Sequence, residues 1–148
     1  MSIDSKVPAE RALPEAHRRG YSDDELAQIY ELGRFSLENG DVRRAESIMF
    51  GLNEVAPEFA PGWLGSCTIH TQNKNYDGAV HAARQALRAD PESPEAMLYL
   101  ICCLLTVKDF NAAGSFLGEV GERVDTNAIN TPNLLRFYRA QLARYQNK

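Results

Sequence analysis

The side chains that could act as nucleophiles include three cysteines, of which Cys102 and Cys103 are adjacent and Cys67 is distant in the sequence. A nucleophilic cysteine needs a basic or otherwise electropositive neighbour that lowers the pKa of its thiol. Cys102 lies in the apolar segment LYLICCLLTV, which offers no such neighbour. We therefore interpret the three thiols as reduced, small apolar groups that pack in a core or line a groove.

The side chains that could bind a metal include three histidines, which are His17, His70 and His81. None of them has a cysteine or a carboxylate at the spacing of a zinc site, so we expect structural or surface positions for all three. The nearby glycines are not followed by the Gly-Lys-Ser/Thr sequence that ends a phosphate-binding loop. The sequence therefore predicts a protein that is not an enzyme and that needs neither a metal nor another cofactor.

The composition predicts a single globular domain. The chain has 148 residues, of which 44% are hydrophobic and 24% are charged, and its net charge is −4. That charge gives no general attraction to phosphate backbones, so nucleic acid is not an expected partner. The longest apolar stretch, residues 97–107, is shorter than the roughly 18 residues that cross a bilayer, and the charged start lacks the apolar region of a signal peptide. We expect a cytoplasmic protein without stable membrane insertion.

A repeat of 34 residues organises the chain. Ala45, Ala79 and Ala113 recur at this spacing, and Pro57 and Pro91 are separated by the same interval. A unit of 34 residues that contains two helices is the tetratricopeptide repeat, and the sequence resembles that family from Leu26 to about Asn127. The recurring alanines mark positions where two helices cross closely, because a larger side chain there would cost about 1–3 kcal/mol through overpacking.

These patterns predict an all-α fold, in which three tandem repeats form a short right-handed superhelix of helical hairpins and a C-terminal helix caps the stack. We expect helices over residues 23–39, 42–55, 59–73, 76–89, 94–107, 110–123 and 132–146. Ser22 and Glu25 form the sequence pattern of a capping box at the first of these, and Thr131-Pro132 begins the last.

The predicted domain organisation has two parts. Residues 1–20 contain two prolines, mixed charges and little apolar periodicity, so we expect a flexible arm. Residues 21–148 form the repeat domain, with repeats over about 26–59, 60–93 and 94–127 and the capping helix over about 132–146.

The first helix of each repeat is expected to supply the concave surface, whereas Trp63 and Met97 should pack inside their helix pairs. The predicted groove residues are Tyr30, Arg34, Leu37, Leu64, Thr68, Thr71, Gln72, Leu98, Cys102 and Leu105. This surface is mostly apolar, and an exposed apolar patch marks a binding site or requires a cover. The cover would be the N-terminal arm or the C-terminal helix of the same chain.

The order of these parts resembles the SycD/LcrH-type translocator chaperones of bacterial type III secretion. The resemblance extends over about residues 22–117. It rests on the start Leu26, Gln28, Ile29 and Tyr30, on Trp63-Leu64-Gly65, and on Tyr76-Asp77 with Ala79. The chain departs from the family pattern at Arg34 and Leu37, where aromatic groove residues are usual, and over residues 67–71.

The resemblance implies a non-catalytic chaperone that holds an extended segment of a hydrophobic translocator, or a related export substrate, in its concave groove. It also implies that a homodimer forms through the arm and the first repeat. The departures imply that the groove takes a different segment or that the chain is a diverged paralogue. The alternative is a generic tetratricopeptide-repeat adaptor that scaffolds partners in another protein assembly.

Overall fold

Every regular element in the described part of the chain is a helix. The computed structural model describes residues 14–148, apart from the side chain of Glu15. The helices are α2 (Glu15–Arg18), α3 (Asp23–Glu38), α4 (Val42–Val55), α5 (Ala60–Gln72), α6 (Tyr76–Ala89), α7 (Pro94–Thr106), α8 (Phe110–Asp125) and α9 (Pro132–Gln146). The seven helices expected from the sequence are all present with ends that agree within about two residues, which confirms the predicted all-α fold class.

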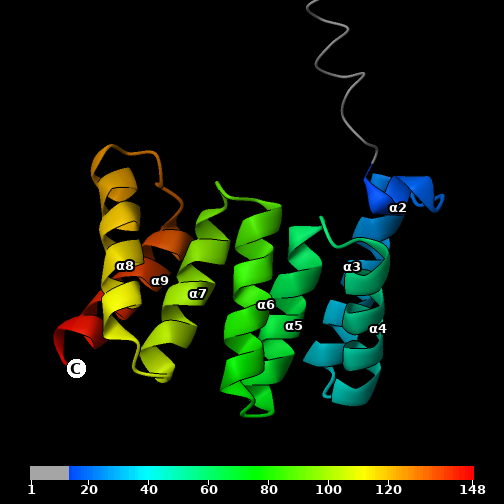
Figure 1. The fold of residues 1–148 in the computed structure, drawn as a ribbon, viewed down its shortest axis with the longest axis horizontal. Helices are drawn as coiled ribbons and strands as arrows, with labels where there is room; N and C mark the ends of the chain where they lie inside the picture. Colours follow the sequence, from blue (N-terminus) through cyan, green and yellow to red (C-terminus); the bar gives the residue numbers. More distant parts are fainter. Residues whose placement is uncertain (1–13) are drawn as a thin grey trace, which may run out of the picture.

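Helices α3 to α8 form three pairs that stand side by side in chain order (Figure 1). Each helix also contacts the next one along the chain, so α4 packs on α5 and α6 packs on α7. Among the first helices, α5 contacts both α3 and α7, which places the three along one side of the stack. No helix in residues 14–148 is long and apolar enough to cross a membrane.

Capping side chains mark the starts of several helices. At α3 the Glu25 N–H donates to the Ser22 hydroxyl at 3.1 Å, and the Ser22 N–H donates to the Glu25 carboxylate at 2.9 Å, which confirms the predicted capping box. The second helix of each pair begins after a residue whose side chain accepts a hydrogen bond from the N–H group three residues later. These caps are Asp41, Asn75 and Asp109.

The turn inside each pair repeats the same backbone geometry. The residue before each of these caps has a left-handed conformation, with φ of 81° at Gly40, 61° at Lys74 and 66° at Lys108. Glycine adopts this conformation without a steric penalty, whereas lysine does not. The second and third turns therefore keep the geometry of the first in spite of a less favourable residue.

The alanines of the repeat lie where the helices of each pair meet. Ala45, Ala79 and Ala113 have exposed fractions of 0%, 1% and 0%. A close approach is also visible between the first two pairs, where a Cβ atom added to Gly65 would lie 2.6 Å from the sulfur of Met49. Small residues at these contacts therefore set the distance between neighbouring helices.

Helix α9 packs against α7 and α8 at the C-terminal end of the stack (Figure 1). It contacts the last pair as the first helix of a further repeat would. Its apolar side chains join the core around α7 and α8, and the rings of Phe137 and Tyr99 meet edge to face at 5.7 Å. The predicted capping helix is therefore present, and it also reaches the side of α7 that carries Tyr99.

The end of the predicted arm packs onto the first repeat. Residues 1–13 of the arm lie outside the described residues, but Glu15–Arg18 form α2. The side chain of Ala16 is buried with Leu26, Leu52 and Ala56, and the Ala16 N–H donates to the Glu58 carboxylate at 3.2 Å. A helix of four residues has too little periodicity to be recognised in a sequence.

Candidate functional site

A first cavity opens between the first helices of the three pairs. It has a volume of about 230 Å³ and is lined by Tyr30, Arg34, Leu37, Glu38, Met49, Leu64, Gly65, Thr68, Glu95 and Tyr99. Helices α3, α5 and α7 supply all of these residues except Met49, which comes from α4. The repeat architecture therefore brings together side chains that lie about one repeat apart in the sequence.

A second cavity continues from the first toward α9. It has a volume of about 180 Å³ and is lined by Cys67, Thr68, Thr71, Gln72, Tyr99, Cys102, Cys103 and Phe137. Thr68 and Tyr99 line both cavities, so the two cavities adjoin, and we call them together the groove. The groove runs from α3 to α9 along the first helices of the stack.

The first cavity is polar and charged. The Arg34 guanidinium donates to the Glu31 carboxylate at 3.1 Å and to the Glu38 carboxylate at 2.9 Å. The hydrogen bond and the charge of Glu31 raise the pKa of Arg34 above its ordinary value. Burial raises the pKa of the Tyr30 and Tyr99 hydroxyls above its ordinary value. This end of the groove combines aromatic rings with charged groups.

The second cavity is mostly apolar. The sulfur atoms of Cys67 and Cys103 lie 3.5 Å apart, and both thiols are buried. The hydrogen bond between them and their burial raise the pKa of Cys67 above its ordinary value. Two threonine hydroxyls at this part of the groove donate to carbonyl groups one turn back in α5: Thr68 to Leu64, and Thr71 to Cys67. The cavity therefore suits an aliphatic or aromatic side chain.

Arg144 of α9 lies beside Cys102, although the two residues are 42 positions apart in the sequence. Its guanidinium contacts the Cys102 sulfur at 3.4 Å and the Thr106 hydroxyl at 3.3 Å. Burial raises the pKa of the Cys102 thiol, and the charge of Arg144 opposes that effect only in part. Because the thiolate is the nucleophilic form, this arrangement does not activate Cys102.

Eight of the ten predicted groove residues line the groove: Tyr30, Arg34, Leu37, Leu64, Thr68, Thr71, Gln72 and Cys102. The other two, Leu98 and Leu105, have exposed fractions of 0% and 6% and belong to the core against which α9 packs. The 34-residue register places Leu98 at the position of Leu64. Leu64 keeps an exposed fraction of 9% and lines the first cavity, whereas Leu98 belongs to the core cluster against which side chains of α9 pack.

Sequence reasoning missed three groove residues that matter for its chemistry. Tyr99 and Glu95 lie one turn apart on α7, and Phe137 comes from α9. Glu95 and Tyr99 are four residues apart, a spacing that places two side chains on the same face of a helix. The sequence could therefore have predicted that these two residues share one face of α7. The contribution of Phe137 depends on how α9 crosses α7, and no local pattern encodes that crossing.

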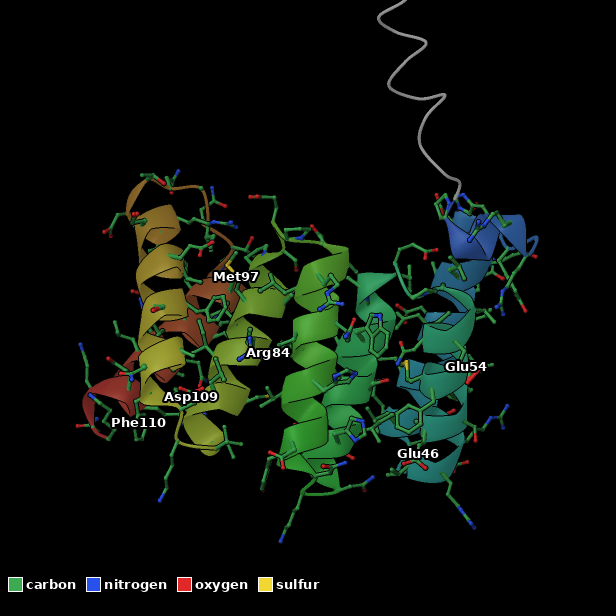
Figure 2. All side chains as sticks on the ribbon, viewed as in Figure 1. Glu46, Glu54, Arg84, Met97, Asp109 and Phe110 are labelled. Carbon is green, nitrogen blue, oxygen red and sulfur yellow. The ribbon has the colours of Figure 1, made fainter. Side chains whose placement is uncertain are left out.

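A separate cavity of about 260 Å³ lies between α4, α5 and α6, and its lining includes Phe50, Trp63, His70 and His81. Trp63, which was expected inside its helix pair, is half-buried here, and its N–H donates to the Pro57 carbonyl at 2.8 Å. Figure 2 labels Glu54 on α4 and Arg84 on α6, the two helices that flank this cavity.

Two further sequence expectations concern Met97 and the histidines. Met97 is buried as expected, with an exposed fraction of 2%. The ring of His70 stacks on Phe50 at 5.3 Å, and His81 meets the edge of Trp63 at 6.2 Å. Within residues 14–148, no three His, Cys, Asp or Glu side chains converge on a position where they could hold a metal ion.

Comparison with known proteins agrees with this architecture. The tetratricopeptide repeat family matches residues 70–129. Comparison with curated protein sequences gives no match.

Solved structures extend the similarity over most of the chain. The type III secretion translocator chaperone SycD of Yersinia enterocolitica has a TM-score of 0.75 and 20% sequence identity, over 93% of this chain and 100% of SycD. SycD in complex with a peptide of the translocator YopD has a TM-score of 0.72 and 21% identity, over 85% of this chain and 93% of SycD. PcrH of Pseudomonas aeruginosa, in complex with the chaperone binding region of PopD, has a TM-score of 0.69 and 22% identity, over 86% of this chain and 93% of PcrH. The chain therefore carries tetratricopeptide repeat sequence over residues 70–129 and has the fold of these translocator chaperones along most of its length.

Proposed function

We propose that this protein is a non-catalytic chaperone that binds an extended segment of a hydrophobic type III secretion translocator, or a related export substrate, in the groove. The observation that carries the proposal is the groove itself, which joins two cavities along α3, α5, α7 and α9. SycD and PcrH, whose fold the chain shares, have been solved with translocator segments.

The groove has the features of a site for an extended peptide. Two adjoining cavities of about 230 and 180 Å³ accept side chains rather than a folded domain. The amide of Gln72, the hydroxyls of Thr68 and Thr71 and the Glu95 carboxylate offer hydrogen-bonding groups for the peptide backbone. A groove that exists before binding reduces the entropic cost of capture, although the peptide itself loses chain entropy. We expect micromolar affinity, about −8 kcal/mol.

The proposal assigns no reaction to the protein. The thiol nearest to the groove opening, Cys102, has a raised pKa, and Cys67 is buried against Cys103. Holding a translocator segment before export requires only binding. The cytoplasm is the compartment in which such a chaperone would act, and reduced thiols in the groove fit that compartment.

We also propose that two copies associate through α3. This helix exposes Leu32 and Phe35, with exposed fractions of 46% and 64%. The 34-residue register places Phe35 at the position of Cys103, which packs against Cys67 of the preceding pair, whereas no helix pair precedes α3 in the described residues. The resemblance to dimeric chaperones suggests that a second copy of the chain covers Leu32 and Phe35. One solved structure of SycD is described as an alternative dimer.

The function is tested by co-expression with type III secretion translocators of the same organism. The fraction of each translocator that stays soluble and co-purifies with this chain is measured. Thr68→Trp fills the junction of the two cavities and should lower the captured fraction about tenfold or more. Val107→Trp changes an exposed residue at the end of α7, outside both cavities, and should leave capture unchanged.

Circular dichroism of both variants separates loss of binding from loss of fold. Undiminished capture by a folded Thr68→Trp protein would exclude the groove as the binding site. Stable co-purification of a folded partner from another assembly, with no translocator bound, would favour the adaptor function instead.

A further inference from the structure

The charges at the two ends of the groove differ in sign. In the first cavity the charge of Arg34 is matched by Glu31 and Glu38, which it contacts at 3.1 and 2.9 Å. Glu95, on the facing helix α7, is exposed and makes no ion pair within the described residues. The charged residues that line the first cavity are therefore the guanidinium of Arg34 and the carboxylates of Glu38 and Glu95, so its lining carries excess negative charge.

The first cavity also contains two aromatic side chains close to this negative charge. Tyr30 comes from α3 and Tyr99 from α7, and the charge of Glu95 acts on both hydroxyls. An aromatic face attracts a cation because the π electrons make the face of the ring electronegative. Tyrosine rings together with an unpaired carboxylate therefore favour an ammonium or guanidinium group over a neutral side chain.

The second cavity has the opposite preference. Its walls are the thiols of Cys67, Cys102 and Cys103 and the rings of Tyr99 and Phe137. The nearest charge is the guanidinium of Arg144, which lies 3.4 Å from the Cys102 sulfur and repels a second cation. An apolar side chain fits this cavity, whereas a basic one does not.

We infer that the segment bound in the groove presents a basic side chain, Arg or Lys, to the first cavity and an aliphatic or aromatic side chain to the second. This inference rests on the proposed function, because it names the ligand of the same groove. Alternate side chains of an extended segment point to one side at a separation of about 6.6–6.8 Å. Because the two cavities adjoin at Thr68 and Tyr99, a basic residue two positions from an apolar residue fits both.

The experiment uses a displayed library of random peptides of about twelve residues, selected on the full-length protein. Selected peptides should be enriched in a basic residue two positions from Leu, Ile, Met or Phe. One such peptide is then labelled with fluorescein, and its affinity is measured by fluorescence anisotropy. Replacing its basic residue by Gln should weaken binding to the natural protein about threefold to tenfold at low salt.

The partner carboxylate is identified by comparing two variants of the protein. In the Glu95→Gln protein the carboxylate that pairs with the basic residue of the peptide is absent. Replacing that basic residue by Gln should therefore change the affinity for this variant less than about twofold. Glu46→Gln removes a carboxylate on α4, labelled in Figure 2, that lines neither cavity, so the full effect should remain. Salt near 1 M should remove the preference in every protein, because the Debye length falls to about 3 Å.

The outcomes separate this inference from the proposed function. Peptides that Thr68→Trp displaces, but that show no basic preference or no dependence on Glu95, would overturn the inference and leave the groove as a peptide site. Peptides that bind equally well to folded Thr68→Trp protein would contradict the proposed function itself.

Discussion

The sulfur atoms of Cys67 on α5 and Cys103 on α7 lie 3.5 Å apart beneath the second cavity. The two residues are 36 positions apart in the sequence, and their contact depends on how the second and third helix pairs pack. Cys102 is adjacent to Cys103 in sequence, but its sulfur contacts Arg144 instead. The contact between Cys67 and Cys103 therefore depends on the packing of α5 against α7, and the contact between Cys102 and Arg144 depends on the packing of α9 against α7.

Oxidation should join Cys67 to Cys103. With copper phenanthroline and oxygen, both thiols lose their protons, a sulfur–sulfur bond forms and the electrons pass to oxygen. The sulfurs need to approach by about 1.5 Å to reach the bond length of a disulfide. Peptide mapping by mass spectrometry of the monomer should find this link, and Cys102→Ser should retain it. A disulfide from Cys102 to Cys67 or to Cys103 as the main product would contradict the packing of α5 on α7.

Ala79→Leu should destabilise the protein. Ala79 has an exposed fraction of 1% at the contact between the helices of the second pair, so a larger side chain forces them apart. Overpacking of this kind costs about 1–3 kcal/mol, and the melting temperature should fall by several degrees. Ala143→Leu, at an exposed position on α9, is the matched control and should have little effect. An unchanged melt for Ala79→Leu would show that the alanine does not set the helix distance.

The repeat made the fold predictable, because its alanines, turn residues and caps all recur at one spacing. The groove was predictable where that register holds, as at Leu64, Thr68 and Thr71. It was only partly predictable at α7, where Cys102 lines the groove as predicted but Leu98 is buried in the core and Tyr99 lines the groove instead. Phe137 and Arg144 reach the groove region through the packing of α9 against α7. Contacts made by α9, which lies outside the repeats, therefore lay beyond sequence reasoning.

Two glycines should respond in opposite directions to the same substitution. A Cβ atom on Gly65 would lie 2.6 Å from the sulfur of Met49, which is fully buried, so Gly65→Ala should destabilise the protein. A Cβ atom on Gly118 in α8 would meet nothing within 4 Å. Gly118→Ala should therefore stabilise the helix by about 0.5–1 kcal/mol. Urea unfolding of both variants measures the two effects, and stabilisation by Gly65→Ala would contradict the close approach of α5 to Met49.

The free energy of unfolding should fall above about pH 10, because tyrosines of the unfolded chain lose their protons there. Burial raises the pKa of Tyr30 and Tyr99 in the folded protein, so the folded chain retains protons that the unfolded chain releases. Their contribution is complete below the unfolded pKa and is lost as pH rises through the folded values. Urea unfolding of the Tyr30→Phe/Tyr99→Phe protein should show a shallower decline than the natural protein. Tyr76→Phe, outside the groove, controls for removal of a hydroxyl, and parallel curves for all proteins would contradict this assignment.

Phe35→Glu should prevent the proposed association through α3. Phe35 is the most exposed large hydrophobic residue described, and Leu32 lies one turn before it on the same helix. Burying these two side chains between copies is favourable by about 25 cal/mol per Å² of apolar surface, whereas burying an unpaired carboxylate at the same contact is costly. Light scattering over a range of concentrations should therefore show a dimer for the natural protein and a monomer for Phe35→Glu. Val107→Glu, which places the same charge at an exposed apolar position near the other end of the stack, should still dimerise. A natural protein that stays monomeric at every concentration, or a Phe35→Glu protein that dimerises normally, would show that α3 is not the interface.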